Sequence, residues 1–481
     1  MKFGGVAVAN GEKIRTVASM INQFREECER KSRRKSGKET EIILVTSAIS
    51  TVTDTLLENA GKIAQEGNIE KVNEFVTVIK DKHDLVASEA IASKNELDSV
   101  KAEISEKVAE MEKALSGICL LGELTPRSLD YISSFGERLA APILAGTLRS
   151  IGNGIDAVHL TGGEAGIITD EEYGNAQLAG KAEQEIRERI MPLLCDKKIP
   201  VVAGFTGETE RGIMTTLGRG GSDYTATIIG AAVDADEIWL WKETEGIMSA
   251  DPKIVKNARR IPYISYIEAM ELSYFGASVL HPKVIEPVIK KEIPIRVKKL
   301  FNLEDEGTLI RKDTEKTKRA AKAITLIEDT SIINLTGTGV KSISDVAARI
   351  FSVLAANSVD SIMISQGSSE LTISLVIKSA QLGRAISAIR SINAGGRIIR
   401  DFTSDSNVCA MGIVGAGMVG TPGVAGKIFS ALGKEGISVI MISQGSSEFN
   451  ISIVVRKEDA YRAVQAIHDV LGMGTTGMGT G

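Results

Sequence analysis

Residues 216–226 read Thr-Leu-Gly-Arg-Gly-Gly-Ser-Asp-Tyr-Thr-Ala and lead into an apolar, helix-like segment, 226–233. Glycines let a backbone approach an anion closely, and backbone N–H groups at a helix start attract it. Arg219 offers a planar fork for a carboxylate or phosphate, whereas Asp223 fits an ammonium group or a charge-organising role. The stretch predicts an anion-binding loop; the plainer alternative is a turn in which Ser222 caps the helix. Its glycines are Gly218, Gly220 and Gly221.

Apolar runs alternate with helical patterns along the first part of the chain. This alternation predicts an α/β fold with a mostly parallel sheet covered by helices on both faces. Ligands of such sheets bind outside the carboxyl ends of the strands. Polar or glycine-rich turns stand at those predicted ends, which favours one shared site. The turns are Gly4-Gly5, Ser47, 204–207 and Lys242-Glu243, beside strand runs that include 42–45, 201–205 and 238–241.

Composition excludes several classes of protein. The 481 residues are too many for one core, so we expect roughly two to four domains. A formal charge of −5 gives no footprint for nucleic acid, and we interpret the basic run 30–38 as a solvated helix end. No apolar run approaches the ~18 residues of a membrane span, and no signal peptide opens the chain. We therefore expect neither nucleic acid nor membrane as a partner.

The cysteines and histidines show no ligand pattern. The four cysteines lie far apart and form no Cys-x-x-Cys pair, which is typical of reduced thiols in a cytoplasmic protein. The four histidines likewise lack metal-ligand spacing. We expect a cytoplasmic protein without a metal site of its own.

The last third of the chain contains a repeat. The run 364–370, Ile-Ser-Gln-Gly-Ser-Ser-Glu, returns unchanged at 442–448. Ile-Phe-Ser at 350–352 returns at 428–430 with the same offset. Each copy reads strand, glycine turn, helix, strand, polar turn, strand and helix, which predicts a βαββαβ module. Two fused modules suggest effector binding or dimerisation, and a purely structural pairing is the alternative.

Six blocks, followed by this doubled module, make nearly the whole chain resemble the aspartokinases of the amino-acid kinase family. The blocks are Lys2-Phe3-Gly4-Gly5, Phe135-Gly136-Glu137-Arg138-Leu139, 162–169, 218–226, Gly246-Ile247-Met248 with Ala250-Asp251-Pro252, and Leu280-His281-Pro282. The resemblance implies an amino-acid kinase fold followed by two α+β ACT domains. The implied boundaries are 1–312 for the kinase domain, 330–393 and 394–470 for the ACT domains, with strand 323–329 joining the second, and 471–481 for a disordered tail.

The resemblance also implies an activity. The protein would transfer the γ-phosphoryl group of ATP, with Mg²⁺, to the side-chain carboxylate of L-aspartate, giving 4-phospho-L-aspartate for lysine, threonine and methionine synthesis. Such a transfer needs positioning and charge neutralisation, and the carboxylate nucleophile is already ionised at neutral pH. Lys2 would neutralise the moving phosphoryl group. Arg219 would bind the aspartate α-carboxylate, and Glu137 with Asp223 would hold the ammonium group.

The resemblance implies the other site residues as well. The substrate would contact Thr53, Glu137, Phe205, Arg219, Gly220, Gly221 and Ser222. The nucleotide would contact Lys2, Phe3, Gly4, Gly5, Ser47, Ser222, Lys242, Glu243, Met248, Asp251, Pro252 and Lys253. An effector, threonine or lysine, would bind at an interface of a homodimer or homotetramer formed by the ACT domains. Its expected contacts are Gly339, Ser365, Gln366, Gly417, Met418, Ser443, Gln444 and Asn450.

The chain departs from the family pattern at several positions. Val6 and Ala7 stand where aspartokinases carry Thr and Ser, and Ser278 stands where Lys often precedes Val-Leu-His-Pro. Only three residues precede the Gly4-Gly5 turn, so we expect a short first strand or a start upstream of Met1. Two other functions stay open: a kinase of the same fold for another acid such as glutamate, and a weakly active or inactive paralogue that senses amino acids.

Overall fold

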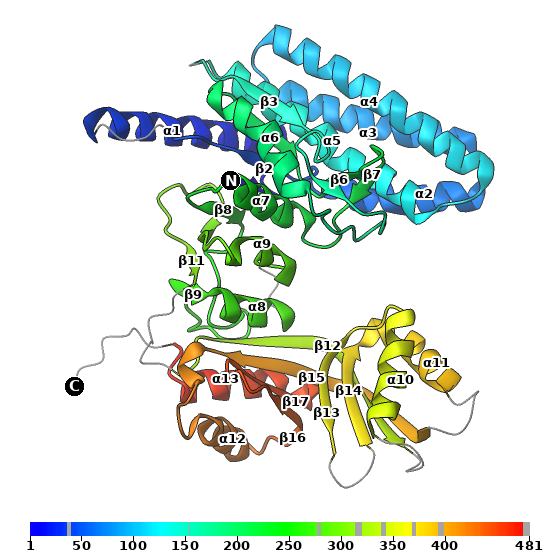
Figure 1. The fold of residues 1–481 in the computed structure, drawn as a ribbon, viewed down its shortest axis with the longest axis vertical. Coiled ribbons are helices and arrows are strands. Elements are labelled where there is room, and N and C mark those ends of the chain that lie inside the picture. The colour runs from blue at the N-terminus through cyan, green and yellow to red at the C-terminus, as the bar shows by residue number, and fades with distance from the viewer. Residues whose placement is uncertain are drawn as a thin grey trace. The chain divides into compact units, whose positions relative to one another are not determined.

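The computed structural model describes residues 1–35, 40–152, 154–276, 280–312, 320–337, 343–367, 372–392 and 399–474. These residues form two compact units (Figure 1). Unit 1 comprises Met1–Gly246 and Lys283–Lys312, and unit 2 comprises Ile247–Pro282 and Asp313–Gly481. The region expected to form the kinase domain, 1–312, is therefore divided between the two units.

A mostly parallel sheet runs through unit 1 in the order β3-β5-β2-β1-β8-β10-β11. Every neighbouring pair from β3 to β10 is parallel, and β11 pairs antiparallel with β10. The central strand β1 has only two residues, yet it pairs on both sides, because Lys2 lies opposite Val45 and Leu240. The strands are β1 (Lys2–Phe3), β2 (Leu44–Thr46), β3 (Ala157–Leu160), β5 (Ile199–Ala203), β8 (Ile238–Lys242), β10 (Ile295–Lys299) and β11 (Thr308–Arg311).

Helices cover this sheet and enclose the largest core of unit 1. Helix α5 is buried almost all round between Ile132 and Leu148, as expected of a helix with apolar residues on every face. The antiparallel helices α3 and α4 lie side by side and pack with α5 (Figure 1). The helices are α1 (Gly11–Lys35), α2 (Val52–Glu66), α3 (Ile69–Ala90), α4 (Lys94–Leu121), α5 (Pro126–Ser150), α6 (Ala182–Cys195), α7 (Gly221–Ala232) and α9 (Glu286–Ile289).

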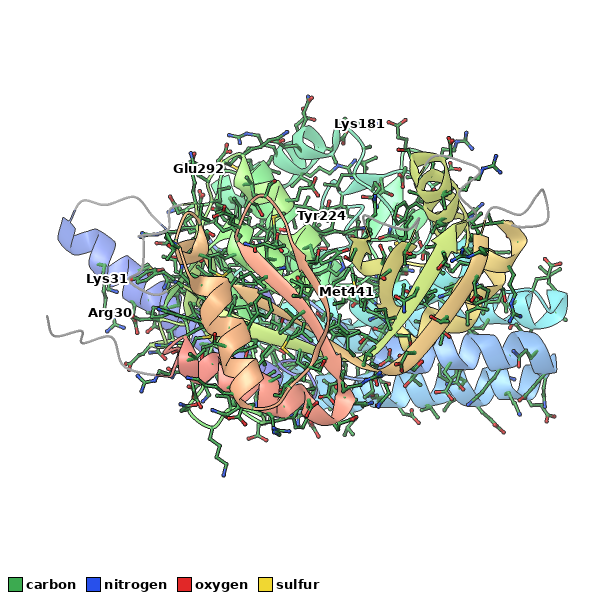
Figure 2. The ribbon with its side chains drawn as sticks, turned by 90° about the horizontal axis from the view of Figure 1, so that it is seen from below. Arg30, Lys31, Lys181, Tyr224, Glu292 and Met441 are labelled. Carbon is green, nitrogen blue, oxygen red and sulfur yellow. The ribbon has the colours of Figure 1, made fainter. Side chains whose placement is uncertain are left out.

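Two features of the helices concern the membrane and the nucleic acid, neither of which we expect as a partner. Within the described ranges, no helix combines the length and the apolarity that crossing a bilayer requires. Arg30 and Lys31, in the described part of the basic run, are exposed on the last turns of α1 (Figure 2).

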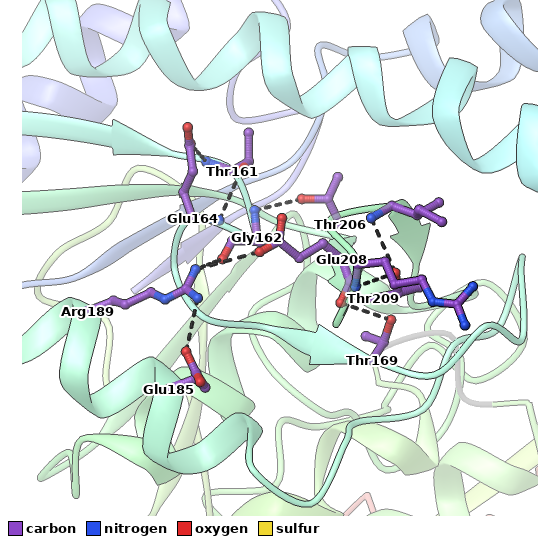
Figure 3. Close-up of polar contacts among 12 residues, drawn as sticks. Thr161, Gly162, Glu164, Thr169, Glu185, Arg189, Thr206, Glu208 and Thr209 are labelled. Carbon is purple, nitrogen blue, oxygen red and sulfur yellow. Dashed lines mark hydrogen bonds and ion pairs between the residues drawn. The ribbon is translucent and has the colours of Figure 1, made fainter.

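A small sheet of β4 (Ile168–Thr169), β6 (Thr206–Thr209) and β7 (Met214–Thr216) adjoins the loop 161–167. The Gly162 N–H donates to Thr206 Oγ1 (2.9 Å), and Thr206 Oγ1 donates to the Ala203 carbonyl (3.0 Å). Arg189 of α6 donates to the Gly163 carbonyl (2.6 Å), so α6 holds the other side of the loop (Figure 3). The loop thus braces the turn that follows β5.

Unit 2 contains one sheet in the order β13-β14-β12-β15-β17-β16, with every neighbouring pair antiparallel. Its longest strands, β12 and β15, pair along most of their length (Figure 1). The strands of this sheet are β12 (Ala323–Gly337), β13 (Ser361–Gln366), β14 (Thr372–Lys378), β15 (Ile399–Val414), β16 (Val439–Gln444) and β17 (Asn450–Arg456). The short strand β9 (Tyr263–Ser265) is not part of it. The helices are α8 (Tyr266–Tyr274), α10 (Ile343–Ala356), α11 (Leu382–Ile392), α12 (Val424–Lys434) and α13 (Ala460–Val470).

Each long strand of unit 2 serves both repeats. The second half of β12 pairs with β14 of the first repeat, while its first half, Ala323–Ile327, pairs with Ala410–Val414 of the second repeat. Strand β15 does the reverse: its second half pairs with β17, and its first half pairs with the end of β12. The expected boundary between residues 393 and 394 therefore separates β15 from β12, the strand of the first repeat with which it pairs.

The expected tail, 471–481, is described as far as residue 474. Its first four residues form a turn after α13, in which the Met473 N–H donates to the His468 carbonyl (3.1 Å). Met473 is buried in the core of the second repeat. Residues 475–481 lie outside the described part of the chain.

We predict that Gly162→Ala destabilises unit 1. A Cβ atom at this position would lie 1.8 Å from the Thr206 carbonyl oxygen, which is backbone and cannot turn away. The free energy of unfolding should fall by about 3 kcal/mol in urea titrations. Gly180→Ala is the matched control, because no atom lies within 4 Å of its added Cβ, and the change should stay within about 1 kcal/mol. An equal effect of both substitutions would contradict the prediction.

Candidate active site

Two lysines, Lys2 of β1 and Lys242 at the end of β8, form a cluster with Asp223 of α7, in which Lys2 and Asp223 are buried and Lys242 is partly buried. Lys2 Nζ lies 2.7 Å from Asp223 Oδ1, and Lys242 Nζ donates to Asp223 Oδ2 at 2.5 Å. Lys2 is 6% exposed and Asp223 is 5% exposed. The cluster carries two positive charges and one negative charge, so it has an excess positive charge in a largely dry environment.

The pKa values reflect this arrangement. Burial alone would raise the pKa of Asp223, but Lys2 and Lys242 outweigh burial and hold that pKa below its ordinary value. Burial lowers the pKa of Lys242; Asp223 partly offsets this effect and Lys2 adds to it. Asp223 is therefore an anion that organises the two lysines rather than a free acceptor.

Glu137 reaches the same place from α5. It is 4% exposed, and among the described residues its Oε2 has no hydrogen-bond partner. Burial raises the pKa of Glu137 to about 8, and contacts with Ala48 and Lys2 offset burial only in part. A buried carboxyl group with one unpaired oxygen can bind a cation that enters from outside.

Glycine lets α5 approach closely at this point. A Cβ atom on Gly136 would lie 2.7 Å from Ala48 Cβ and 3.1 Å from Thr53 Oγ1. Gly136 therefore lets α5 lie directly against the loop after β2, and Glu137 follows it into the site.

Phe205 forms another wall through an unusual backbone conformation. Its φ angle is +68°, a left-handed value that a phenylalanine seldom adopts. The Phe205 N–H donates to Thr225 Oγ1 of α7 (3.0 Å), and its carbonyl accepts from the Leu217 N–H (2.9 Å). A Cβ atom on Gly221 would lie 2.7 Å from the Phe205 ring, so this glycine leaves room for the aromatic side chain.

These groups enclose a cavity of about 220 Å³. The glycine-rich loop supplies one side, with Gly218 at φ +73° and Gly220 at φ +72°. Gly220 precedes α7 without any side-chain cap, so Ser222 does not cap this helix as the plainer alternative required. The cavity is lined by Lys2, Thr53, Glu137, Phe205, Gly218, Gly220, Gly221, Ser222 and Asp223.

The loops after β1 and β2 meet beside this cavity. A Cβ atom on Gly5 would lie 3.0 Å from the Ala48 carbonyl, so glycine permits the close packing of the two loops. The Ser47 N–H donates to the Phe3 carbonyl (3.1 Å). Lys82 of α3 supports the second loop, since its Nζ donates to the Ser50 carbonyl (3.1 Å).

Seven of the expected contacts in unit 1 do not line the cavity: Gly4, Gly5 and Lys242, which lie in the turn or the cluster described above, and Arg219, Glu243, Phe3 and Ser47. Arg219 lies on the glycine-rich loop between two lining residues, but its side chain is exposed and has no ion pair within the described residues. Glu243 is also exposed. The Phe3 side chain is fully buried and stacks on Trp241, with ring centroids 5.8 Å apart, so it belongs to the core. Ser47 is partly buried near the Gly4-Gly5 turn.

The remaining expected nucleotide contacts belong to unit 2. Met248 forms a bridge with Arg260, and the Asp251 carboxylate accepts from the Lys253 N–H (2.8 Å). Asp251, Pro252 and Lys253 are exposed. Their part in a nucleotide site stays a prediction.

The expected effector residues fall into two groups within unit 2. The first group contains Asn450, whose Nδ2 donates to Glu271 Oε2 (3.1 Å). It lies close to the loop that contains Gly417 and Met418, because the Gly415 N–H donates to the carbonyl of the neighbouring Phe449 (3.0 Å). In the second, the edge strands β13 and β16 carry the two Ser-Gln pairs. Their residues are Ser365, Gln366, Ser443 and Gln444. Gly339 lies outside the described residues.

Sequence reasoning did not identify two residues that support the site. Lys82 braces the loop after β2, and Asp130 of α5 accepts hydrogen bonds next to the glycine-rich loop. Asp130 stands seven residues before Glu137 in the same helix. Nothing in the local sequence marks either residue, because each acts through hydrogen bonds to a segment far away in the chain.

Comparisons with known proteins agree with this architecture. The amino acid kinase family model matches residues 1–299, and the ACT domain model matches residues 333–391 and 411–471. Aspartokinase 1, chloroplastic, of Arabidopsis thaliana is 32% identical over 97% of this chain and 79% of its own length. The bifunctional aspartokinase/homoserine dehydrogenase 1, chloroplastic, of that plant is 31% identical, and this chain spans 52% of it. The chain thus covers about half the length of such bifunctional relatives.

Solved structures show the same fold. The structure of E. coli aspartokinase III in complex with aspartate and ADP superposes with a TM-score of 0.79 over 98% of this chain and 99% of that one, at 24% identity. Clostridium acetobutylicum aspartate kinase gives a TM-score of 0.71 at 26% identity, with 98% and 99% coverage.

Fold and site together define an amino acid kinase domain joined to ACT domains. Within that class, the chain belongs to the aspartokinase family. The predicted fold class and the predicted family are both confirmed.

We predict that Glu137 makes stability fall as pH rises from about 4.5 to about 8. Over that range the folded protein retains a proton that the unfolded chain has released, because the pKa of Glu137 rises from 4.5 to about 8 on folding. Glu137→Gln should remove this pH dependence and raise the relative stability at high pH by more than about 1 kcal/mol. Urea titrations at pH 5 and pH 9 measure the effect.

Glu106→Gln, at an exposed position of α4, is the control for that measurement. It should leave the pH dependence as in the unsubstituted protein. If Glu137→Gln also leaves the dependence unchanged, then Glu137 is ionised in the folded protein and the prediction is wrong.

Proposed function

We propose that the protein is an aspartate kinase that transfers the γ-phosphoryl group of ATP to the side-chain carboxylate of L-aspartate, giving 4-phospho-L-aspartate. The observation that carries the proposal is the buried Lys2–Asp223–Lys242 cluster beside an uncapped, glycine-rich helix start. Such a site concentrates positive charge and backbone N–H groups where a phosphoryl group needs them. The similarity to aspartokinases over almost the whole chain supports the choice of substrate.

The two lysines would act on the phosphoryl group. Lys2 and Lys242 are held by one carboxylate, so their ammonium groups are positioned before any ligand arrives. Gly4 has no side chain that could cover the Lys2 ammonium group: a Cβ atom there would lie 3.6 Å from Lys2 Nζ. The N–H groups of Gly4 and Gly5 would bind phosphoryl oxygens. The transfer needs no general base, because the substrate carboxylate is already ionised.

The amino-acid end of the substrate would be bound by Glu137 and Arg219. The unpaired Oε2 atom of Glu137 would accept a hydrogen bond from the substrate ammonium group, whose charge favours the ionised carboxylate. Arg219 has no partner among the described residues, so its guanidinium group is available for the α-carboxylate. The size of the cavity, about 220 Å³, suits a small amino acid.

The residues present also fit a magnesium nucleotide. Two lysines and two glycine-rich turns suit its phosphates, whereas no group of three His, Cys, Asp or Glu residues within the described ranges could hold a metal ion. Mg²⁺, which neutralises phosphate charge when bound, would therefore be held mainly by nucleotide oxygens and water. The remaining nucleotide contacts that we propose are Ser47, Ser222, Glu243, Met248, Asp251, Pro252 and Lys253.

Unit 2 would provide regulation. We propose that threonine or lysine binds the ACT domains of a homodimer or homotetramer and shifts an equilibrium between active and inactive states. One related structure is described as E. coli aspartokinase III in complex with lysine and aspartate. The product would feed lysine, threonine and methionine synthesis. A cytoplasmic location stays a prediction, because the plant relatives are named chloroplastic.

The proposal predicts a product that hydroxylamine traps. With Mg-ATP, the protein should form aspartate hydroxamate and release ADP, and it should not form glutamate hydroxamate. Arg219→Ala should raise the KM for aspartate about 100-fold, because a charged hydrogen-bonding group is lost from the substrate site. Arg211→Ala is the matched control, since Arg211 is an exposed arginine of the β6–β7 turn, and its KM should not change.

Other outcomes would select the open alternatives. Hydroxamate formed from glutamate but not aspartate would indicate a kinase for another acid. Binding of threonine or lysine without any turnover would indicate an amino-acid sensor, and Val6 and Ala7 beside the glycine turn would then be the first departures to examine.

We also predict that Asn450→Ala weakens inhibition by the effector. Asn450 lies beside the loop of Gly417 and Met418, and loss of its amide should raise the inhibitory concentration of threonine or lysine about 10-fold, without changing uninhibited kcat. Asn407→Ala is the control, because Asn407 is exposed on β15 and contacts Glu458 instead. Inhibition curves measured with each amino acid separately give both the effector and the shift. Equal curves for both variants would place the effector elsewhere.

A further inference from the structure

Asp130 is a buried acid in the second turn of α5 whose carboxylate is fully engaged. It is 2% exposed. Its Oδ2 accepts from the N–H groups of Gly174 (2.9 Å) and Thr216 (2.8 Å), and its Oδ1 accepts from Thr216 Oγ1 (2.7 Å). One side chain therefore joins α5 to two segments that lie far from it in the sequence.

Both of those segments border the start of the glycine-rich loop. Thr216 is the last residue of β7 and stands two residues before Gly218. A Cβ atom on Gly218 would lie 2.9 Å from Asn175 Oδ1 and 3.0 Å from the Gly174 carbonyl, so the loop lies flush against the turn that Asp130 binds. The Ala176 N–H closes this arrangement by donating to the Thr216 carbonyl (2.9 Å).

The same helix carries Glu137. Asp130 and Glu137 are seven residues apart, so they project from the same side of α5, two turns from each other. The Arg219 side chain forms no hydrogen bond or ion pair with another residue in the described part of the chain. Its position is therefore set by the backbone of the loop. The distance between Arg219 and Glu137 then depends on how the loop is attached to α5.

We propose that Asp130 is a positioning residue, which attaches the loop 217–221 to α5 and so fixes Arg219 relative to Glu137. This inference rests on the proposed function, in which those two residues bind the carboxylate and the ammonium group of one amino acid. Asp130 itself contacts neither ligand. It sets the spacing at which the two charged groups of an amino acid are recognised.

Trypsin provides a test that does not require activity. The bond after Arg219 is a trypsin site on the loop, so its cleavage rate in the full chain reports how firmly the loop is held. Asp130→Ala should speed this cleavage about 10-fold or more, as measured by mass spectrometry of the released peptides, while cleavage after exposed Arg30 is unchanged. Asp130→Asn should behave like the unsubstituted protein, because Asn offers the same acceptor oxygen, and its amide can donate to Thr216 Oγ1.

Two further variants separate positioning from general damage. Thr147→Val removes a buried hydroxyl group whose one hydrogen bond among the described residues lies within α5, to the Ile143 carbonyl, and it should not change cleavage after Arg219. Thr216→Val removes one of the three hydrogen bonds and should give an intermediate rate, which keeps the proposal testable if Asp130→Ala does not fold. The proposal is overturned if cleavage after Arg219 is the same in folded Asp130→Ala and Asp130→Asn.

Kinetics provide the second readout. Asp130→Ala should raise the KM for aspartate about 10-fold or more, while the KM for ATP changes much less, and Asp130→Asn should restore both. Equal losses for both substrates would show a merely structural role and would overturn the proposal. If the unsubstituted protein forms no aspartate hydroxamate, the proposed function fails, and the trypsin experiment alone decides the role of Asp130.

Discussion

A carboxylate held between two ammonium groups inside the protein sets the geometry of unit 1. Asp223 reaches Lys2 from one side and Lys242 from the other, and it thereby joins the first turn of α7 to the ends of β1 and β8. A buried ion cluster adds little net stability, because desolvation opposes the attraction, but removal of one partner is costly. The arrangement therefore specifies one position for α7, and the glycine-rich loop ends at the start of that helix.

Around this cluster, close backbone approach matters more than side-chain bulk. Gly5, Gly136 and Gly221 each stand where a Cβ atom would come within about 3 Å of a neighbouring loop or ring. Phe205 shows the converse, since a bulky residue is held at positive φ by hydrogen bonds to α7 and to Leu217. Strain of this kind persists only when the surroundings over-determine the conformation, and it is common where a side chain must be aimed at a ligand.

The sequence predicted the architecture well because its signals are local. Alternating strands and helices indicated a parallel sheet, and the repeat indicated paired modules. The resemblance to a family named several residues of the cavity: Lys2, Glu137, Phe205 and Asp223 do lie together. Long-range hydrogen bonds leave no such trace. The contact of Asp130 with Thr216 joins residues 86 positions apart, and nothing local distinguishes this acid from a solvated one. Which residues pack into one compact unit also depends on contacts between distant parts of the chain. The order of the motifs therefore could not predict that Ile247–Pro282 belongs to unit 2.

The two repeats of unit 2 are interlocked by exchange of strands. Each long strand begins beside a strand of the other repeat and ends beside the strands of its own, because β12 starts beside Ala410–Val414 and β15 starts beside the end of β12. A single repeat, if it were produced alone, would lack the strand segment that the other repeat contributes to its edge. In evolutionary terms, neither copy can be lost, shuffled or inherited alone without leaving an open sheet edge, so the duplication, once interlocked in this way, is difficult to reverse.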